Sequence, residues 1–266
     1  MTGVFINGGR LVRRSPPLSR RPSRDPRRRR APAGVVLGPQ PIPGGTRGVG
    51  RAVASAFAAE GAHVTICARD GTDVEETVEA LSAEGSVTGT RTDVRDEFDV
   101  ERLMEHAARA GERDGIDVVV ANAAVNRGTP GEMPVDGEPY ARFDDTVRTN
   151  VRGVFATVRE AEPHLADDAR ILVPSGSVAR EAKPGMGAYA VSKAGAEAVV
   201  RGADADLDAT AFTLDLGLVD TALTGNQGGR DPEDVAPMFL WAATEADPAE
   251  HGGEVVGLRE WKSATR

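Results

Sequence analysis

The sequence predicts an α/β fold built on a doubly wound parallel sheet in a single domain, and three observations predict it. The chain has 266 residues, 40% of them hydrophobic, which is enough for one domain with a sizeable buried core. After Gly50, short apolar runs alternate with amphipathic helical stretches, a pattern typical of a parallel sheet covered by helices on both faces. A glycine-rich loop over residues 44–50 opens the first of these helical stretches.

The elements are predicted in chain order from the spacing of apolar residues. Such residues recur at helical spacing over 49–57, and Gly61 follows as the predicted end of that helix. Asp96 and Asp231 stand where the N-caps of later helices are expected. The predicted strands are 63–68, 87–90, 116–121, 170–173, 211–216 and 254–257. The predicted helices are 48–60, 73–83, 97–110, 140–165, 186–203 and 232–244.

Residues 1–34 differ in composition from the rest of the chain. They contain ten Arg and one acidic residue among many Pro and Ser, without helical or strand periodicity, and so predict a disordered basic tail outside a domain over 35–266. A functional interpretation is an arm that binds nucleic acid or a membrane surface. The alternatives are a solvated tail or a wrongly assigned gene start.

The segment that should form the first strand carries prolines at alternate positions, 39, 41 and 43. Proline has no N–H group for a ladder hydrogen bond, so this segment is not expected to serve as a central strand. A misassigned reading frame before Gly44 is one hypothesis. If the prolines are real, we expect a short stub over 35–37, a weakened nucleotide site and a fold of reduced stability.

Composition excludes several classes of function. The single Cys67 cannot form an internal disulfide, which favours a reducing, cytoplasmic setting. No apolar run is long enough to cross a membrane, and none follows the first arginines as a secretory signal requires. The net charge is −9, so residues after the basic tail carry −18, which disfavours nucleic acid as their partner and resembles proteins of salt-loving microbes. The four histidines lack metal-site spacing, so no metal site is expected.

The loop Gly44-Gly45-Thr46-Arg47-Gly48-Val49-Gly50 suits a pyrophosphate. Its glycines let the backbone approach a ligand closely, and the helix that follows supplies free N–H groups and positive potential at its N-terminus. An ordinary glycine-rich turn before a helix is the alternative for this loop taken alone.

Further short motifs follow the later elements. They are Asp93-Val94, Asn122-Ala123-Ala124, Thr149-Asn150-Val151, Ser175-Gly176-Ser177, Tyr189-Ala190-Val191-Ser192-Lys193 and Gly217-Leu218-Val219-Asp220-Thr221. With two Tyr and three Lys in the chain, chance predicts on the order of a few hundredths of a Y-x-x-x-K pair.

In this order and spacing, the loop and the motifs resemble the short-chain dehydrogenase/reductase family over nearly all of residues 43–257. The chain departs from the family pattern at Pro43 (usually Thr), Ala124 (usually Gly) and Leu216 (usually Pro). The resemblance implies a Rossmann-like fold and a nicotinamide cofactor. The residues it places at the cofactor are Gly44, Thr46, Arg47, Gly48, Val49, Gly50, Arg69, Asp93, Val94, Asn122, Ala123, Tyr189, Lys193, Val219 and Thr221.

The same resemblance implies a catalytic set of Asn150, Ser177, Tyr189 and Lys193. A tyrosine hydroxyl has a pKa near 10 and needs a nearby cation to act as acid or base at neutral pH, and Lys193 follows one helical turn later. Ser177 is expected to polarise a substrate carbonyl, and Asn150 to support a water path from Lys193. Ser175 competes with Ser177 for the serine role. Ser177, which is followed by Val178-Ala179 and lies 12 residues before Tyr189, fits the family pattern better, although the family separation is 13 and this loop is one residue short.

Two arginines indicate the cofactor. Arg69 ends the second predicted strand, where an acid would accept from the 2′-hydroxyl of NAD, and Arg47 lies in the loop. Guanidinium groups pair well with phosphate, and family members with basic residues at these places usually prefer NADP. We therefore expect NADP rather than NAD, with solvated arginines as the alternative.

The sequence thus predicts an oxidoreductase that transfers a hydride between NADP(H) and a carbonyl or secondary alcohol. One alternative is a catalytically silent member with a damaged first strand, and another is a nucleic-acid-binding protein that uses the basic arm. The expected partners are a small-molecule substrate and further copies of the chain in a homodimer or homotetramer, with neither nucleic acid nor membrane.

Overall fold

The computed structural model describes residues 40–110, 115–226 and 228–266. The predicted tail over 1–34 and the predicted stub over 35–37 lie outside these residues. Among the helices of the described part, none is both long and apolar enough to cross a bilayer.

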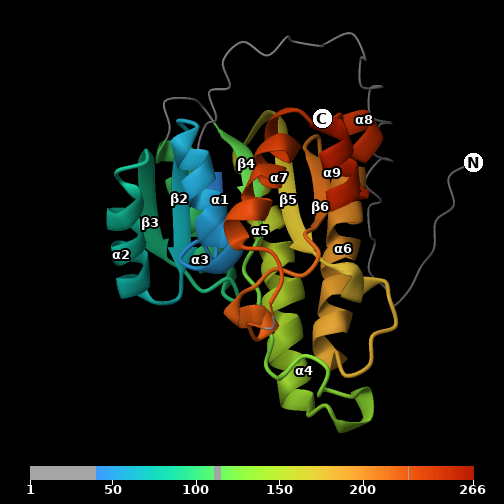
Figure 1. The fold of residues 1–266 in the computed structure, drawn as a ribbon. Helices are drawn as coiled ribbons and strands as arrows, with labels where there is room; N and C mark the ends of the chain where they lie inside the picture. The colour runs from blue at the N-terminus through green and yellow to red at the C-terminus, as the bar shows by residue number, and fades with distance from the viewer. Residues whose placement is uncertain (1–39, 111–114, 227) are drawn as a thin grey trace, which may run out of the picture. The chain divides into compact units, whose positions relative to one another are not determined.

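The described strands are all parallel and form two sheets with the orders β1-β2-β3 and β4-β5-β6-β7. β1 also lies beside β4, so the two sheets continue one another in the arrangement of a doubly wound fold (Figure 1). The bounds are Gln40–Pro43 for β1, His63–Ala68 for β2, Ser86–Arg91 for β3, Ile116–Val120 for β4, Leu165–Ser175 for β5, Thr210–Asp215 for β6 and Val255–Gly257 for β7.

The proline-bearing segment does form a strand, but one that pairs on one side only. In β1, Ile42 lies in register with Ile66 of β2, and the N–H of Gly44 donates to the carbonyl of Cys67 at 2.9 Å. Since backbone groups of successive strand residues point to opposite neighbours, the positions of Pro41 and Pro43 are those whose N–H would face β4. Proline supplies none, which explains why the ladder is interrupted between β1 and β4.

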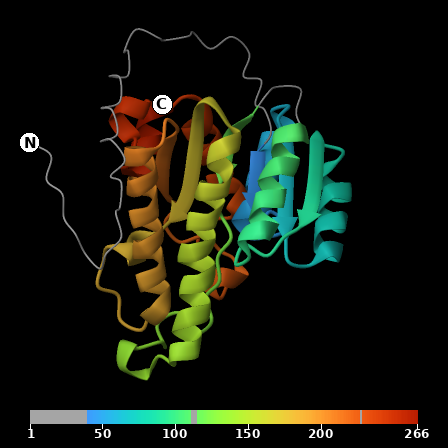
Figure 2. The ribbon, with the colours of Figure 1, turned by 180° about the vertical axis from the view of Figure 1, so that it is seen from behind.

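Helices cover both faces of the sheets. α1 (Gly48–Ala59), α7 (Pro232–Thr244) and α9 (Leu258–Ala264) lie on one face, and α3 (Glu97–Ala110), α5 (Gly153–Ala161) and α6 (Gly187–Asp206) lie on the other (Figures 1 and 2). α2 (Gly71–Leu81) packs on β2 and β3. Two short helices complete the set, α4 (Tyr140–Val147) and α8 (Pro248–His251).

Two hydrophobic cores follow from the alternation of side chains along the strands. Leu172 and Phe212 belong to the core beneath α1 and α7, whereas their chain neighbours Ile171 and Ala211 belong to the core beneath α3, α5 and α6. These buried positions show less than 1% exposure, as a sheet covered on both faces requires.

Several predicted boundaries shift. The predicted helix 140–165 is divided into α4, a π-helical stretch over Arg148–Arg152 and α5, and it ends at Ala161 before a 3-10 turn that contains Pro163. β5 consequently begins at Leu165, five residues before the predicted start. α2 begins at Gly71, earlier than predicted, because the Asp70 side chain caps it by accepting from Thr72 N at 2.9 Å.

The predicted helix signals have mixed outcomes. Asp96 accepts from the backbone N–H groups of Phe98 and Asp99 at 3.0 and 3.1 Å, so this N-cap is confirmed. Gly61 follows α1 with φ +83°, a left-handed conformation that suits glycine, which confirms it as the helix end. Asp231 precedes α7 but makes no side-chain capping bond.

Candidate active site

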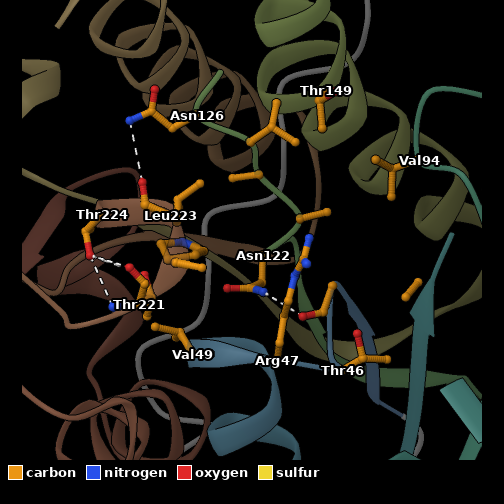
Figure 3. A pocket seen from close by; sticks show the side chains of 18 of the residues that line it. Thr46, Arg47, Val49, Val94, Asn122, Asn126, Thr149, Thr221, Leu223 and Thr224 are labelled. Atoms are coloured by element: carbon orange, nitrogen blue, oxygen red, sulfur yellow. Dashed lines mark hydrogen bonds between the residues drawn. The ribbon is translucent and has the colours of Figure 1, made fainter. Parts of the chain in front are cut away.

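A cavity of about 670 Å³ opens at the carboxyl ends of the strands, across the boundary between β1 and β4. Its lining comes from the loops that follow β1 to β6, which the fold brings to one edge of the two sheets. In doubly wound sheets ligands bind at this edge, where the strand order reverses. Figure 3 shows this pocket at close range.

The glycine-rich loop lies at the floor of the pocket, where β1 passes into α1. Gly48 has φ +51°, which disfavours a side chain, and a Cβ on Gly50 would lie 2.2 Å from the carbonyl oxygen of Gly44. α1 starts without a side-chain cap, so its first N–H groups remain for a ligand. Across the sheet boundary, Asn122 Nδ2 donates to Gly44 O at 3.3 Å and holds the loop against the end of β4 (Figure 3).

The basic residues predicted for a phosphate are present at the pocket. Arg47 and Arg69 both line it and are exposed, and neither guanidinium has an ion-pair or hydrogen-bond partner within the described ranges. Arg51, on the next turn of α1, lines a smaller hollow together with Arg47, Asp73 and Glu76. Arg51 is not among the residues predicted from the sequence, although its i+4 spacing from Arg47 on a helix indicates it.

Asp93 and Val94 line the pocket at the end of β3 as predicted. The Asp93 carboxylate is not isolated, because Arg95 pairs with it at 2.6 Å and also with Asp145 of α4 at 3.2 Å. Hydrogen bonding by Arg95 holds the pKa of Asp93 below its usual range. One end of the pocket is therefore bounded by an ion-pair network, which Arg127 extends at 2.5 Å from Asp145.

Tyr189 and Lys193 lie one turn apart on α6, and both line the pocket. The Lys193 ammonium lies 5.8 Å from the centroid of the Tyr189 ring and donates to the carbonyl of Pro174 at 3.0 Å. Burial lowers the pKa of Lys193 to about 8, against the opposing field of Glu197. Burial raises the pKa of Tyr189 to about 12. A protonated tyrosine beside a lysine of reduced pKa is an arrangement that can deliver a proton to a bound oxygen atom.

Asn150 is buried in the π-helical stretch between α4 and α5. Its amide exchanges two 2.8 Å hydrogen bonds with the backbone of Val125, and its Nδ2 also donates to Ser192 Oγ at 3.0 Å. The side chain thus ties the loop after β4 to α6. Inserted π turns recur at functional sites because they free backbone carbonyls.

The two candidate serines differ in position. Ser175 lines the pocket and donates to Glu197 Oε1 at 2.7 Å, inside the protein. Ser177 is not among the described lining residues, and its hydroxyl contacts Nζ of Lys183. The structure therefore brings Ser175, Tyr189 and Lys193 together around the pocket and places Ser177 beside it.

The loop after β6 closes the pocket from the opposite side. Val219 and Thr221 line it as predicted, and Thr221 is held by its N–H bond to Thr224 Oγ1 at 3.1 Å (Figure 3). Asn126 Oδ1 and Asp220 Oδ1 are buried lining atoms without a hydrogen-bond partner among the described residues. Orphaned buried acceptors and the uncapped helix together fit a bound polar molecule that carries both N–H donors and phosphates.

A further group of charged residues was missed from the sequence. It connects the loop after β5 to α6 and β6, and its members are Arg180, Lys183, Glu197 and Asp215. No motif marks these residues. Of these residues, only Glu197 could have been predicted from the sequence, because it follows Lys193 at the i+4 spacing of helical neighbours.

Comparisons with known proteins agree with this geometry. The family described as enoyl-(acyl carrier protein) reductase matches residues 44–250. The human protein "Dehydrogenase/reductase SDR family member 4" is 34% identical over 151 residues, 56% of this chain and 52% of that protein, so the match spans about half of that relative's length.

Two solved structures have similar folds. An alcohol dehydrogenase from the archaeon Thermococcus sibiricus, complexed with 5-hydroxy-NADP, has a TM-score of 0.72 and 26% identity, covering 84% of this chain and 96% of that one. A dehydrogenase/reductase from Sinorhizobium meliloti has a TM-score of 0.72 and 25% identity, covering 84% and 94%. With the family match over most of the sequence and the Rossmann-like arrangement of the strands, the chain belongs to the short-chain dehydrogenase/reductase family.

Proposed function

We propose that this protein is an NADP-preferring oxidoreductase that interconverts a ketone or aldehyde with the corresponding alcohol. The observation that carries the proposal is the placement of Tyr189 and Lys193, one helical turn apart, on the wall of the pocket into which the glycine-rich loop opens. Proton donor and phosphate cradle thus share one cavity.

Tyr189, Lys193 and Asn150 have different roles in the proposed reaction. Tyr189 donates its hydroxyl proton to the substrate oxygen during reduction and takes it back during oxidation. Lys193 places a positive charge beside that hydroxyl and stabilises the tyrosinate that forms when the proton leaves. Asn150 holds the loop after β4 against α6, so the pocket wall keeps its shape. Nicotinamide dinucleotide, when bound, supplies or takes the hydride.

The preference for NADP is supported by the free basic side chains. Arg47, which precedes α1, and Arg69, which follows β2, both line the pocket, and Arg51 lines the smaller hollow with Arg47. A 2′-phosphate offers these groups bidentate partners that the 2′-hydroxyl of NAD lacks. The similar Thermococcus sibiricus enzyme was solved with an NADP derivative.

A second candidate function has its own support. Ser177 contacts Lys183 instead of lining the pocket, and the ladder between β1 and β4 is interrupted beneath the loop. A catalytically silent member that binds the dinucleotide and acts as a regulatory or structural partner would tolerate both features. The oxidoreductase would turn over a carbonyl substrate, whereas the silent member would not.

The biological setting is part of the proposal. We place the protein in the cytoplasm with a small carbonyl or alcohol compound as substrate. We also propose a homodimer or homotetramer, because α5 and α6 expose Phe155 and Val191 to about half of their full area.

The test is a fluorescence titration of the purified protein with NADPH and with NADH, in dilute and in molar salt because of the acidic surface, followed by a screen of carbonyl substrates. Tighter binding of NADPH together with turnover of a ketone or aldehyde supports the enzyme. Tight NADPH binding without turnover of any carbonyl supports the silent member. Absence of binding to folded protein overturns both.

A further inference from the structure

Glu197 is a buried carboxylate one turn beyond Lys193 on α6. Only 3% of the residue is exposed, and its Oε1 accepts from Ser175 Oγ at 2.7 Å and pairs with the guanidinium of Arg180. A buried carboxylate is retained only where hydrogen bonds and a counter-charge offset its desolvation. The residue lies behind the pocket wall formed by Ser175 and Lys193 and does not itself line the pocket.

Arg180 joins Glu197 to the far side of the site. Its second amino group pairs with Asp215 Oδ2 at the end of β6, and Asp215 Oδ1 accepts from the backbone N–H of Gly217 at 3.0 Å. Gly217 lines the pocket in the left-handed conformation, with φ +64°. Glu197, Arg180 and Asp215, which we call the back cluster, thus connect the α6 wall to the loop after β6.

Lys193 has no direct ion pair in the part of the chain that the structure describes. Lys193 is 7% exposed, and its ammonium donates to the carbonyl of Pro174. The next residue, Ser175, donates to Glu197 of the back cluster. Because burial without a counter-charge disfavours an ammonium ion, the Lys193 side chain needs a negative charge nearby to stay protonated. Glu197 is the group whose field opposes the burial effect on the Lys193 pKa.

Charged and titratable groups belong to several of the elements around the pocket wall that carries Lys193. α6 contributes Tyr189 and Glu197, the loop after β5 contributes Arg180, and β6 with its following loop contributes Asp215 and Asp220. On the α4–α5 side, Asp145 and Arg152 are turned to other partners, Arg127 and Glu97 respectively.

We propose that Glu197 is a positioning residue for the proposed reaction: its buried carboxylate is the counter-charge that keeps Lys193 an ammonium ion, and Arg180, anchored by Asp215, limits how much of that charge Lys193 feels. The inference rests on the proposed function for its catalytic meaning, but the charge coupling itself does not require turnover. The proposal also explains why Arg180 pairs with both α6 and the end of β6: these contacts fix the Glu197 carboxylate behind Lys193.

The coupling predicts opposite effects for two variants that break the same ion pair. Glu197→Gln removes a negative charge and keeps the shape, so the pKa of Lys193 should fall by about one unit. Arg180→Met removes a positive charge and frees Glu197, so the pKa should rise. The rise should be the smaller effect, because about a third of the Arg180 side chain reaches solvent. A purely structural role would move both variants in the same direction.

Lysine-selective ¹³C labelling and NMR titration of the full chain measure this directly, since the chain has only Lys183, Lys193 and Lys262. Lys193→Arg assigns the signal, and Lys262 serves as internal reference. Asp206→Asn, an exposed charge removal at the far end of α6, is the matched control and should leave the Lys193 titration unchanged. If Glu197→Gln does not fold, Asp215→Asn replaces it, with a fall in pKa again expected against the rise in Arg180→Met.

Unchanged Lys193 titration in folded Glu197→Gln, or shifts of the same sign in both variants, would overturn the proposal. A second measurement follows the rate of carbonyl reduction as a function of pH. In each variant the alkaline limb of this profile should move with the Lys193 pKa measured by NMR. A wild-type protein without turnover, combined with the opposite NMR shifts, would refute the proposed function and leave the charge coupling established.

Discussion

The ammonium of Lys183 donates to the hydroxyl oxygen of Ser177, the serine that lies 12 residues before Tyr189. The Ser177 hydroxyl also hydrogen-bonds to the Glu181 carboxylate, and this bond lowers the pKa of Glu181. Ser175 donates to a different carboxylate, the buried Glu197. The two serines are therefore held by different charged groups, although they are separated by one residue.

Substituting each serine separates their roles. The family resemblance assigns the catalytic role to Ser177, which lies beside the pocket; if Ser177 serves that role, Ser177→Ala should lower kcat about 100-fold, the cost typical of losing one donor to a developing oxyanion, with the Kd for NADPH unchanged. Ser175→Ala should cost about 1 kcal/mol of unfolding free energy, because it leaves Glu197 one hydrogen bond short, with a smaller loss of kcat. Steady-state kinetics and urea unfolding check both. A larger kcat loss in Ser175→Ala than in Ser177→Ala would reverse the assignment.

Tyr189→Phe tests the acid/base role. The variant removes one hydroxyl group and keeps the ring against Lys193, so turnover should be lost while NADPH binds nearly as in the wild type. Activity and fluorescence titration are measured on the same preparation. Tyr140→Phe is the matched control, since this exposed tyrosine on α4 does not line the pocket and should leave both quantities unchanged. Turnover retained in Tyr189→Phe would exclude the mechanism.

Arg69→Ala tests the preference for the phosphorylated cofactor. Loss of a guanidinium that meets a 2′-phosphate should raise the Kd for NADPH about 10-fold or more, with the Kd for NADH nearly constant. Arg201→Ala, on the exposed face of α6, is the control. An equal change in both cofactors would show that Arg69 contributes only general positive potential.

Pro43→Thr tests the interrupted sheet. The substitution restores an N–H at a position that faces β4, and a ladder hydrogen bond there should add about 1 kcal/mol to the free energy of unfolding. Gln40→Val is the control, because it adds a β-branched residue to the same strand without adding an N–H group. Urea unfolding measures the difference. Equal stability of Pro43→Thr and the wild type would mean that the proline does not cause the gap between β1 and β4.

The pKa of Lys193 predicts a pH dependence of stability. Burial lowers it from 10.5 to about 8, so between these values the unfolded chain holds a proton that the folded protein has released. The free energy of unfolding contributed by this group therefore rises with pH from about 8 to 10.5, and below about 8 the buried ammonium costs its full penalty. Lys193→Met should lose this rise. Urea unfolding of both proteins across this range measures it, and parallel curves would contradict the lowered pKa.

The alternation of apolar runs placed most elements correctly, and the reasons for the exceptions are specific. α2 begins before its predicted start because the Asp70 side chain caps it, although the apolar pattern begins later. The π-helical stretch at Arg148–Arg152 has no periodicity that distinguishes it from a regular helix. The start of β5 was missed because Asp167 and Asp168 interrupt the apolar pattern of residues 165–169, and the strand state there follows from pairing with β4 at Leu165.

The sequence by itself determined the family resemblance and the two-sided sheet, because apolar periodicity, glycine spacing and the Tyr-Lys pair are local properties of the chain. Only the tertiary structure decided that β1 pairs with β2 alone, that Ser177 meets Lys183, and that Glu197, Arg180 and Asp215 stand behind Lys193. These are contacts between segments far apart in sequence. They depend on burial and on the direction of each side chain, which a linear pattern does not carry.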